Sequence, residues 1–268
     1  MIDVGSLTWT DLRRGLAVQS RIITALILRE MRTRFGEMQF GYAWALIEPL
    51  AQIGVLVFVF TLVGRHPPIG TSYESFFLTG YVTYGLFRQI SGRAAQSITA
   101  NRALLSFPPV RNMDTVWARI LLETATGLTA FLMVTAIFGY LGAPVIPHDI
   151  LQYLAGFASV LALSWGFGLF NAAISPIWGT WMVIFAWFGR LQYFFSGVFF
   201  IPDNLPPAAR YFVSWNPLAH SIIWVREGFY DGYVSIILDK TYPFLVAIVL
   251  AISGLAIEFV FRRKVDAK

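Results

Sequence analysis

Side chains that could carry out bond chemistry are few in this chain, and they do not occur in the patterns that known reactions need. A nucleotide-binding P-loop ends in Gly-Lys-Ser or Gly-Lys-Thr, because the lysine must reach phosphates held by a glycine-rich turn. The lysines are Lys240, Lys264 and Lys268, and none of them follows a glycine. We therefore predict no catalytic residue, and this chain alone should not hydrolyse ATP.

Metal and thiol chemistry lack their usual ligands. The sequence has no cysteine, which excludes disulfides, thiolate metal sites and cysteine nucleophiles. Its histidines, His66, His148 and His220, fall in predicted connections between helices and do not have the His-Glu-x-x-His spacing of a zinc site. We predict that the chain binds no metal and no cofactor, and a membrane-embedded transferase is disfavoured for the same reason.

One group of aromatic residues suits binding rather than catalysis. Its members recur at spacings of three and four, which places them on one face of a helix. They are Trp178, Trp181, Phe185, Phe188 and Phe195, with the polar Gln192 on the same face. Aromatic planes can contact the apolar face of a sugar ring without reading its hydroxyl pattern, so this aromatic stripe is a candidate lining for a polysaccharide path. Ordinary packing between helices is the alternative.

Arg190 interrupts the same apolar stretch. An arginine inside a membrane is costly unless it is paired, hydrated or able to extend to the interface. It could form an ion pair with Glu48, contact an anionic polymer in the path, or lie at the interface. At 100° per residue Arg190 lies about 200° around a helix from Phe188, so it should not face the same cavity as the stripe.

The composition shows what kind of protein must position these residues. Hydrophobic residues make up 57% of the 268 positions and charged residues 13%, whereas a soluble domain carries roughly 25% charge. We predict an all-α integral membrane protein with six transmembrane helices in a single domain over 1–268. Residues 1–41 are expected to be cytoplasmic or interfacial, 42–261 to form the six-helix core, and 262–268 to be a cytoplasmic tail.

Runs with few or no charges locate the six predicted spans, because a charged residue at mid-bilayer costs about 2.5–3.5 kcal/mol. The spans are 42–63, 76–95, 115–140, two within 150–189, and 241–261. Glu48 interrupts the first, and the lower half of the second carries Arg88 and Arg93, so we expect that end to reach the headgroups or to lie in protein contacts. The forty residues 150–189 would form about 60 Å of helix, twice the hydrocarbon thickness, so the chain must turn back. Ser175-Pro176 is the predicted turn, since proline breaks the helical ladder.

The distribution of basic residues predicts the orientation. Segments 1–42, 88–119 and 262–268 hold 6, 5 and 4 of them, and the opposite side holds four, which are Arg65, Arg210, Arg226 and Lys240. The positive-inside rule therefore places both termini in the cytoplasm. Because membrane topology accounts for the net charge of +5, we predict no nucleic-acid partner.

Two cytoplasmic segments could contact a partner. Residues 20–37 combine an apolar face with Arg29, Arg32 and Arg34, which predicts an amphipathic helix on the membrane surface. Such a helix could anchor the chain to anionic lipid or move with an ATPase. Residues 101–107 could form a short helix with an apolar surface suited to a partner's groove, although a solvated loop is the alternative. The residues of this candidate dock are Asn101, Arg102, Leu104, Leu105, Phe107 and Arg111.

The predicted outward connection, 200–240, is unusually apolar and aromatic for a loop. Pro202, Pro206, Pro207 and Pro217 interrupt it, and Phe212 lies between them. Exposing so much apolar surface to water costs free energy, so we expect this segment to be covered by lipid or protein. We predict short re-entrant or interfacial helices that form a membrane-embedded outer gate.

Several of these segments together resemble a known family. REMRTRFGEMQFGYAWALIEPL at 29–50, the NRALLSFPPV and DTVWARILLE segments, and SGVFFIPDNLPP followed by WNPLAH at 196–220 are similar to the KpsM-type capsular polysaccharide permeases of the type 2 ABC exporter family. The resemblance covers nearly the whole chain and rests on diffuse motifs in the right order.

The resemblance implies a homodimer in the bacterial inner membrane that moves a lipid-linked capsular polysaccharide to the periplasm. Two separate ATP-binding subunits, which hold ATP and magnesium, would contact the loop at 101–110. It further implies that 20–37 is an interface helix beside the ATPase and that 200–220 forms the outer gate. An envelope-spanning copolymerase and an outer-membrane exporter are the expected further partners.

Other functions remain compatible with the residues. A lipopolysaccharide O-chain or a teichoic acid is an alternative substrate for an exporter of this kind. An ion channel or secondary transporter would also explain six spans with a buried arginine, but it would need no ATPase.

Overall fold

The computed structural model describes residues 9–35, 41–64, 66–105 and 110–266, and all regular structure in these ranges is helical. The elements are α1 Trp9–Phe35, α2 Gly41–Leu62, α3 Tyr73–Phe77, the π-helix η2 Leu78–Val82, α4 Thr83–Ala94, α5 Ser97–Ala100, α6 Arg102–Leu105, α7 Asn112–Tyr140, α8 Ile150–Ile174, α9 Trp181–Phe195, the 3-10 helix η3 Pro202–Asn204, α10 Pro207–Val213, α11 Pro217–Phe229 and α12 Tyr242–Asp266.

Each predicted span coincides with a helix. Three helices within the described residues are long and apolar enough to cross a membrane: α7, α8 and the part of α12 over Tyr242–Phe261. α2 contains a shorter apolar stretch, Ile47–Leu62. The predicted reversal at Ser175-Pro176 is confirmed: α8 ends at Ile174, α9 begins at Trp181, and Trp181 and Phe188 of α9 contact Phe170 and Phe167 of α8 in antiparallel order.

The second predicted span is one continuous helix with an irregular centre. It begins at Tyr73, where the side chain of Ser72 accepts a hydrogen bond from the backbone N–H of Ser75 at 3.2 Å. Its middle, η2, has the wider π-helical turn, and α4 continues to Ala94. A π-turn inside an α-helix frequently marks a functional position, so η2 is a candidate location for a functional site.

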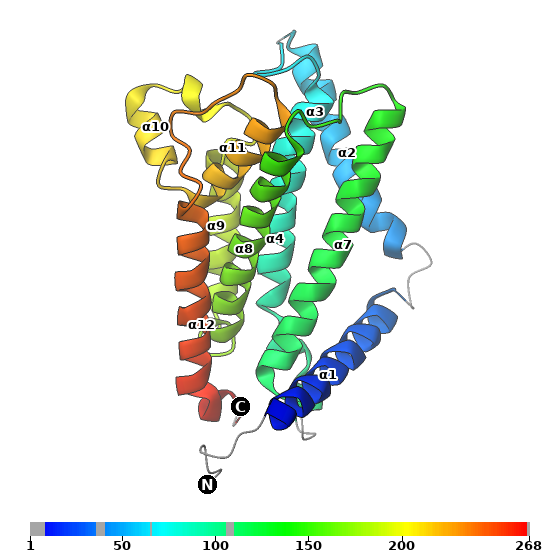
Figure 1. Cartoon of the computed structure of the whole chain (residues 1–268), viewed down its shortest axis with the longest axis vertical. Helices are drawn as coiled ribbons and strands as arrows, with labels where there is room; N and C mark the ends of the chain where they lie inside the picture. Colours follow the sequence, from blue (N-terminus) through cyan, green and yellow to red (C-terminus); the bar gives the residue numbers. More distant parts are fainter. Residues whose placement is uncertain (1–8, 36–40, 65, 106–109, 267–268) are drawn as a thin grey trace.

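Helix α8 lies at the centre of the bundle, beside α4, α11 and α12 (Figure 1). Glycines allow its backbone to approach its neighbours closely. A Cβ on Gly156 would lie 2.6 Å from the backbone nitrogen of Val225 in α11. A Cβ on Gly254 of α12 would lie 2.7 Å from the carbonyl carbon of Leu169 in α8. Small residues at such contacts are how apolar helices gain packing energy in lipid.

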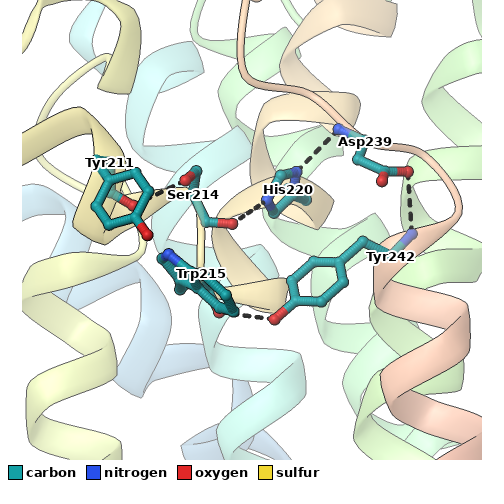
Figure 2. A pocket seen from close by; sticks show the side chains of 6 residues that line it. All are labelled: Tyr211, Ser214, Trp215, His220, Asp239 and Tyr242. Atoms are coloured by element: carbon teal, nitrogen blue, oxygen red, sulfur yellow. Dashed lines mark hydrogen bonds between the residues drawn. The ribbon is translucent and has the colours of Figure 1, made fainter. Parts of the chain in front are cut away.

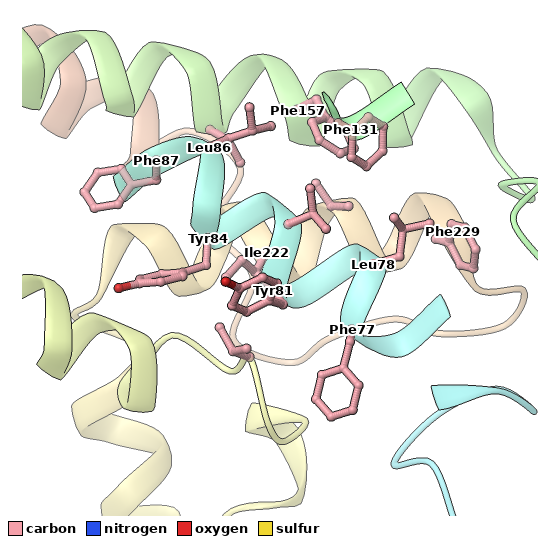
Figure 3. Close-up of a cluster of buried hydrophobic side chains, with 14 of the residues drawn as sticks. Phe77, Leu78, Tyr81, Tyr84, Leu86, Phe87, Phe131, Phe157, Ile222 and Phe229 are labelled. Atoms are coloured by element: carbon pink, nitrogen blue, oxygen red, sulfur yellow. The ribbon is translucent and has the colours of Figure 1, made fainter. Parts of the chain in front are cut away.

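The main hydrophobic core lies where α3, η2 and α4 pack against α7, α8 and α11 (Figure 3). Aromatic rings dominate it, and Phe131 and Phe157 are only 4.6 Å apart between centroids. Phe76 and Phe77 are completely buried. This core holds the irregular second helix in place from its amino end.

The two ends of the bundle differ. α1 crosses one end, where it contacts α7 and where α12 also finishes (Figure 1). The short helix α10 lies at the opposite end, together with the connection that precedes α12 (Figure 1). We call these the α1 end and the α10 end.

Candidate functional site

Three tyrosines from two helices meet beside α2. Tyr81 and Tyr84 come from η2 and α4, and Tyr193 comes from α9. The rings of Tyr84 and Tyr193 have centroids 5.1 Å apart, and those of Tyr81 and Tyr193 are 6.1 Å apart. Figure 3 shows Tyr81 and Tyr84 extending from the second helix. We call this group the tyrosine cluster.

Hydrogen bonds tie the tyrosine cluster to the helices on both sides. The Tyr84 hydroxyl donates to the backbone carbonyl of Gly189 in α9 at 2.8 Å. The Tyr81 hydroxyl donates to the side-chain oxygen of Gln52 in α2. The cluster therefore bridges α2, α4 and α9, which are far apart in the sequence.

Charged side chains of opposite sign flank the cluster. Arg88 is exposed on α4, one turn beyond Tyr84, and its charge acts on Tyr84 and Tyr193. Glu48 is exposed on α2, and its charge acts on Tyr81. Rings, hydroxyls and charges of this kind can stack on and hydrogen-bond to a polar polymer, but they provide no nucleophile held beside a base.

Sequence reasoning missed the tyrosine cluster. Tyr81, Tyr84 and Arg88 are spaced by three and four, which is the signal that could have found two of the three tyrosines. Tyr81, Tyr84 and Arg88 lie within the predicted span 76–95, whose end with Arg88 was expected at the headgroups or in protein contacts.

The aromatic stripe of α9 packs inward against α8. Phe188 stacks on Phe167 at 5.6 Å between centroids, and Phe185 is buried beside them. The indole N–H of Trp181 donates to the side-chain oxygen of Asn171 at 3.1 Å. Within one chain, the stripe therefore fixes α9 to α8.

The two ends of the stripe differ from its centre. The prediction that Trp178 continues the helical stripe was wrong: Trp178 lies in the turn before α9 and is half exposed, because Pro176 ends the helical ladder. At the other end Gln192 is buried, and its side-chain oxygen accepts a hydrogen bond from the Ser196 hydroxyl at 2.9 Å.

The opposite face of α9 is exposed and apolar, with Trp187, Leu191 and Phe194 each more than half accessible. Arg190 lies on this face, and its guanidinium carbon is 4.7 Å from the centre of the Trp187 ring. Among the described residues Arg190 forms no salt bridge, so the pair with Glu48 is not formed there. A stacked guanidinium retains its charge for an interaction outside this chain.

At the α1 end, Asn101 is a buried link rather than an exposed docking residue. Its side-chain oxygen accepts a hydrogen bond from Arg29 of α1 at 3.0 Å. Its amide donates to the carbonyl of Ser97 at 2.9 Å and to Glu30 at 3.4 Å. α1 and the short helices α5 and α6 are therefore joined through one amide side chain.

A second set of polar contacts joins α1 to α7. Arg119 of α7 forms a salt bridge with Glu30 at 2.5 Å and lies 3.8 Å from Glu123 one turn further along. Glu123 is fully buried and accepts a hydrogen bond from Gln89 of α4 at 2.8 Å. We call Glu30, Arg119 and Glu123 the buried ionic network.

The remaining residues of the candidate dock lie nearer the surface. Arg102 is exposed, while Leu104 and Leu105 are half-buried in α6. Arg111 is exposed directly before α7, and its backbone N–H donates to Asp114 at 3.0 Å. Arg32 is exposed on α1, whereas Phe107 and the side chain of Arg34 lie outside the described residues.

At the α10 end, the predicted short helices are present but differ from each other. Pro202 begins η3, Pro206 precedes α10, and Pro217 begins α11. α10 is mostly exposed, with Phe212 73% accessible, whereas most of α11 is buried. The prolines therefore begin these elements as expected, but α11 belongs to the core.

A shallow pocket of about 270 Å³ lies between α10, α11 and the start of α12 (Figure 2). The side chain of His220 lines this pocket. Its Nε2 donates to the carbonyl of Ser214 at 2.8 Å, and its Nδ1 accepts a hydrogen bond from the backbone N–H of Asp239 at 2.9 Å. These bonds require the neutral Nε2–H tautomer. Burial lowers the pKa of His220 below its usual value. The two hydrogen bonds of His220 therefore connect α11 to the carboxyl end of α10 and to the segment before α12.

The sequence as a whole identifies the family. Residues 21–230 match the family model described as ABC-2 type transporter. The chain belongs to the ABC-2 type transporter family. This assignment is consistent with the apolar helices of a multi-pass membrane protein.

Several relatives that are named for transport or export match most of the length of the chain. The chain is 30% identical over 245 residues to the polysialic acid transport protein KpsM of Escherichia coli, covering 91% of this chain and 95% of KpsM. It is 30% identical over 261 residues to the capsule polysaccharide export inner-membrane protein CtrC of Neisseria meningitidis, covering 96% and 97%. The O-antigen export permease RfbA of Klebsiella pneumoniae is 24% identical, covering 88% and 90%.

Proposed function

We propose that this chain is the membrane subunit of an ATP-driven exporter that moves lipid-linked capsular polysaccharide across the bacterial inner membrane. The observation that carries the proposal is similarity over nearly the full length to proteins named for capsule export. The lower identity to an O-antigen permease makes a lipopolysaccharide O-chain the second candidate. The chain contributes the path and performs no bond chemistry.

The proposed topology has six spans with both termini in the cytoplasm. Helices lie at all six positions of the predicted spans, and α12 ends at the same end of the bundle as α1 (Figure 1). The basic residues of α1 support a cytoplasmic position for that end. α10 then lies at the periplasmic side, where the polymer leaves.

We propose that the tyrosine cluster faces the polymer path and that a second copy of the chain completes this path. Polar groups within apolar helices are expensive and usually mark a route for a polar substrate. The exposed apolar faces of α2 and α9 lie on either side of the cluster and offer a surface for the second copy. The aromatic stripe would position α9, while contact of its members with polymer is the rival role.

The ATPase dock in this proposal consists of α5, α6 and the exposed side of α1. Two ATP-binding subunits would hold ATP and magnesium and act on Leu104, Leu105 and the neighbouring arginines. Asn101 would pass their motion to α1, because it bonds to both Arg29 and Glu30. A copolymerase and an outer-membrane exporter would continue the route beyond the α10 end.

The proposal is tested in a capsule-producing strain that lacks its own permease. The chain should restore surface polysaccharide and co-purify with an ATP-binding subunit in a 1:1 ratio. Restoration of O-antigen alone would select the second candidate. A stable assembly that conducts ions and contains no ATPase would refute the exporter.

Variants then test the path. Tyr84→Phe removes the hydroxyl that bonds to Gly189, and Arg88→Gln removes the adjacent charge. Both should lower export at normal permease abundance and normal ATPase binding. The matched control is Tyr140→Phe, because Tyr140 is 92% exposed at the end of α7. Normal export in the first two, with export lost in Trp181→Ala, would move the path to the stripe.

A further inference from the structure

Arg226 is a fully buried cation with no role in the proposed function. It lies in α11, and its side chain is among the largest with almost no exposed surface. Its guanidinium donates to three backbone carbonyls: Nη1 to Gly197 at 2.6 Å and to Phe200 at 3.1 Å, and Nη2 to Val198 at 3.3 Å. No carboxylate among the described residues forms a salt bridge with it.

Such a site is expensive, since a buried charge loses its hydration and is normally compensated by a counter-charge. Here backbone dipoles and one aromatic ring supply the compensation: the guanidinium carbon lies 4.2 Å from the centre of the Phe76 ring. The planar, forked guanidinium can reach carbonyls that point from different residues, whereas a lysine ammonium is a single point. The geometry therefore requires arginine in particular.

The segment that Arg226 holds connects α9 to η3. We call residues 197–200 the outlet loop. Phe199 lies between the bound carbonyls of Val198 and Phe200, and its ring centroid is 4.8 Å from that of Tyr193 in the tyrosine cluster. The same ring lies 6.5 Å from Phe60 of α2. Arg226 thus fixes the residue that contacts both α9 and α2 at one end of the cluster.

The π-turn of the second helix makes room for this arrangement. A Cβ on Gly80 of η2 would lie 2.7 Å from the Nη2 atom of Arg226 and 3.1 Å from the carbonyl oxygen of Val198. A Cβ on Gly85, in the same continuous helix, would meet no packed neighbour within 4 Å. The requirement for glycine is therefore specific to the contact with Arg226 and the outlet loop.

The position of Arg226 is itself fixed. α11 contacts α8 at Gly156, where the backbones approach too closely for a side chain. In contrast, α10 is largely exposed. The outlet loop is thus attached to the rigid centre of the bundle and not to the exposed short helix.

We propose that Arg226 is a positioning residue for transport: it holds the outlet loop so that Phe199 sets the outer end of the polymer path between α2 and α9. This inference rests on the proposed function, because it takes the tyrosine cluster as the path. It follows that opening at the α10 end moves α10 and leaves the outlet loop in place.

The test uses the full chain in membranes, where the absence of native cysteine allows a single probe. Val198→Cys places a thiol at a buried position of the outlet loop. This thiol should resist an impermeant maleimide in the otherwise unchanged chain. Adding Arg226→Lys or Gly80→Ala should speed labelling about tenfold or more, the shift expected when a hydrogen bond to a charged group is lost. Adding Gly85→Ala should leave it protected.

Export is measured in parallel with permease abundance and ATPase pull-down. Arg226→Lys and Gly80→Ala should lose export while abundance and pull-down stay normal, and Phe199→Ala should lose export with the Val198→Cys thiol still protected. Unchanged labelling and export in the first two variants would overturn the proposal. Disappearance of Arg226→Lys, Gly80→Ala and Phe199→Ala from the membrane would also overturn it, since Arg226 would then serve folding alone.

The design separates this inference from the proposed function. If the unchanged chain exports a polymer other than capsule, the labelling pattern and the loss of that export still test Arg226. Faster labelling without any loss of export would show that Arg226 holds the loop but has no role in positioning for transport, which contradicts the inference and leaves the proposed function intact.

Discussion

The buried ionic network predicts unequal effects for its members. Arg119 serves two carboxylates, Glu30 at 2.5 Å and Glu123 at 3.8 Å, while its own side chain is only 15% exposed. Replacing Arg119 with Met therefore leaves two acidic groups without their shared cation. Replacing Glu30 with Gln leaves Arg119 with Glu123 and keeps an oxygen that can accept a hydrogen bond.

The magnitudes follow from burial. Removing one partner of a buried ion pair costs about 3–5 kcal/mol, and Glu123 has no exposed surface with which to recover hydration. The hydrogen bond that Glu123 accepts from Gln89 limits the loss to the lower part of that range. For Glu30→Gln the expected cost is about 1–3 kcal/mol, the usual range for a weakened buried hydrogen bond. The double variant should cost less than the sum by about 1–2 kcal/mol, because the two residues interact directly.

The free energy of unfolding can be measured by titrating the purified chain in mixed micelles with a denaturing detergent and following tryptophan fluorescence. The matched control is Arg21→Met, since Arg21 is exposed on α1 and should change the unfolding free energy by no more than about 0.5 kcal/mol. Equal costs for the two single variants, or strict additivity in the double variant, would refute the reasoning that Arg119 holds α1 on the bundle.

Further predictions concern packing, pH and coupling. Gly156→Ala should lower the unfolding free energy by about 1–3 kcal/mol in the same titration, because its Cβ would lie 2.6 Å from Val225 N, whereas Gly85→Ala should raise it by about 0.5–1 kcal/mol. Stability should fall as the pH drops below about 6.5, because the lowered pKa of His220 means that the unfolded chain binds the proton first. His220→Gln should flatten that part of the curve, and an unchanged slope would exclude His220 as its source. Leu105→Asp should reduce ATPase pull-down and export together at normal abundance, so unchanged values in both assays would remove α6 from the dock.

The sequence was a good guide to where helices lie. The predicted spans 42–63 and 241–261 differ by one residue at their starts from α2 and α12. The reason is that the cost of a charge in lipid depends on composition over a window, which needs no knowledge of neighbours. The proline at Pro176 similarly acts through local backbone chemistry, so the reversal after α8 was predictable.

The direction in which each helix face points was not predictable. In water a stripe of aromatic residues faces the core, but in lipid both faces of a helix are apolar and the pattern loses its meaning. The stripe through Phe185 and Phe188 was therefore compatible both with a polymer path and with packing between helices, and the pattern did not identify α8 as its partner. The side chain that accepts the hydrogen bond from Trp181 is Asn171, which lies on α8.

Buried polar residues were misread for a related reason. Arg226 was counted among outward basic residues, because its partners are backbone carbonyls that leave no trace in sequence patterns. Asn101 was expected in an exposed dock, but its contacts with Arg29 and Glu30 join segments about seventy residues apart. Long-range contacts of this kind require the three-dimensional fold.

The glycine contacts of α8 also bear on the order in which the chain can assemble during synthesis. Gly166 and Leu169 of α8 lie against Ala247 and Gly254 of α12, which is synthesised after α8. At roughly 5–20 residues per second, α8 waits on the order of ten seconds before that partner emerges. During this interval the central helix of the finished bundle is inserted but undocked on one side. A chain interrupted before Tyr242 would leave the α12-facing side of α8 exposed to lipid. This exposed helix face would distinguish an incomplete chain from a finished bundle.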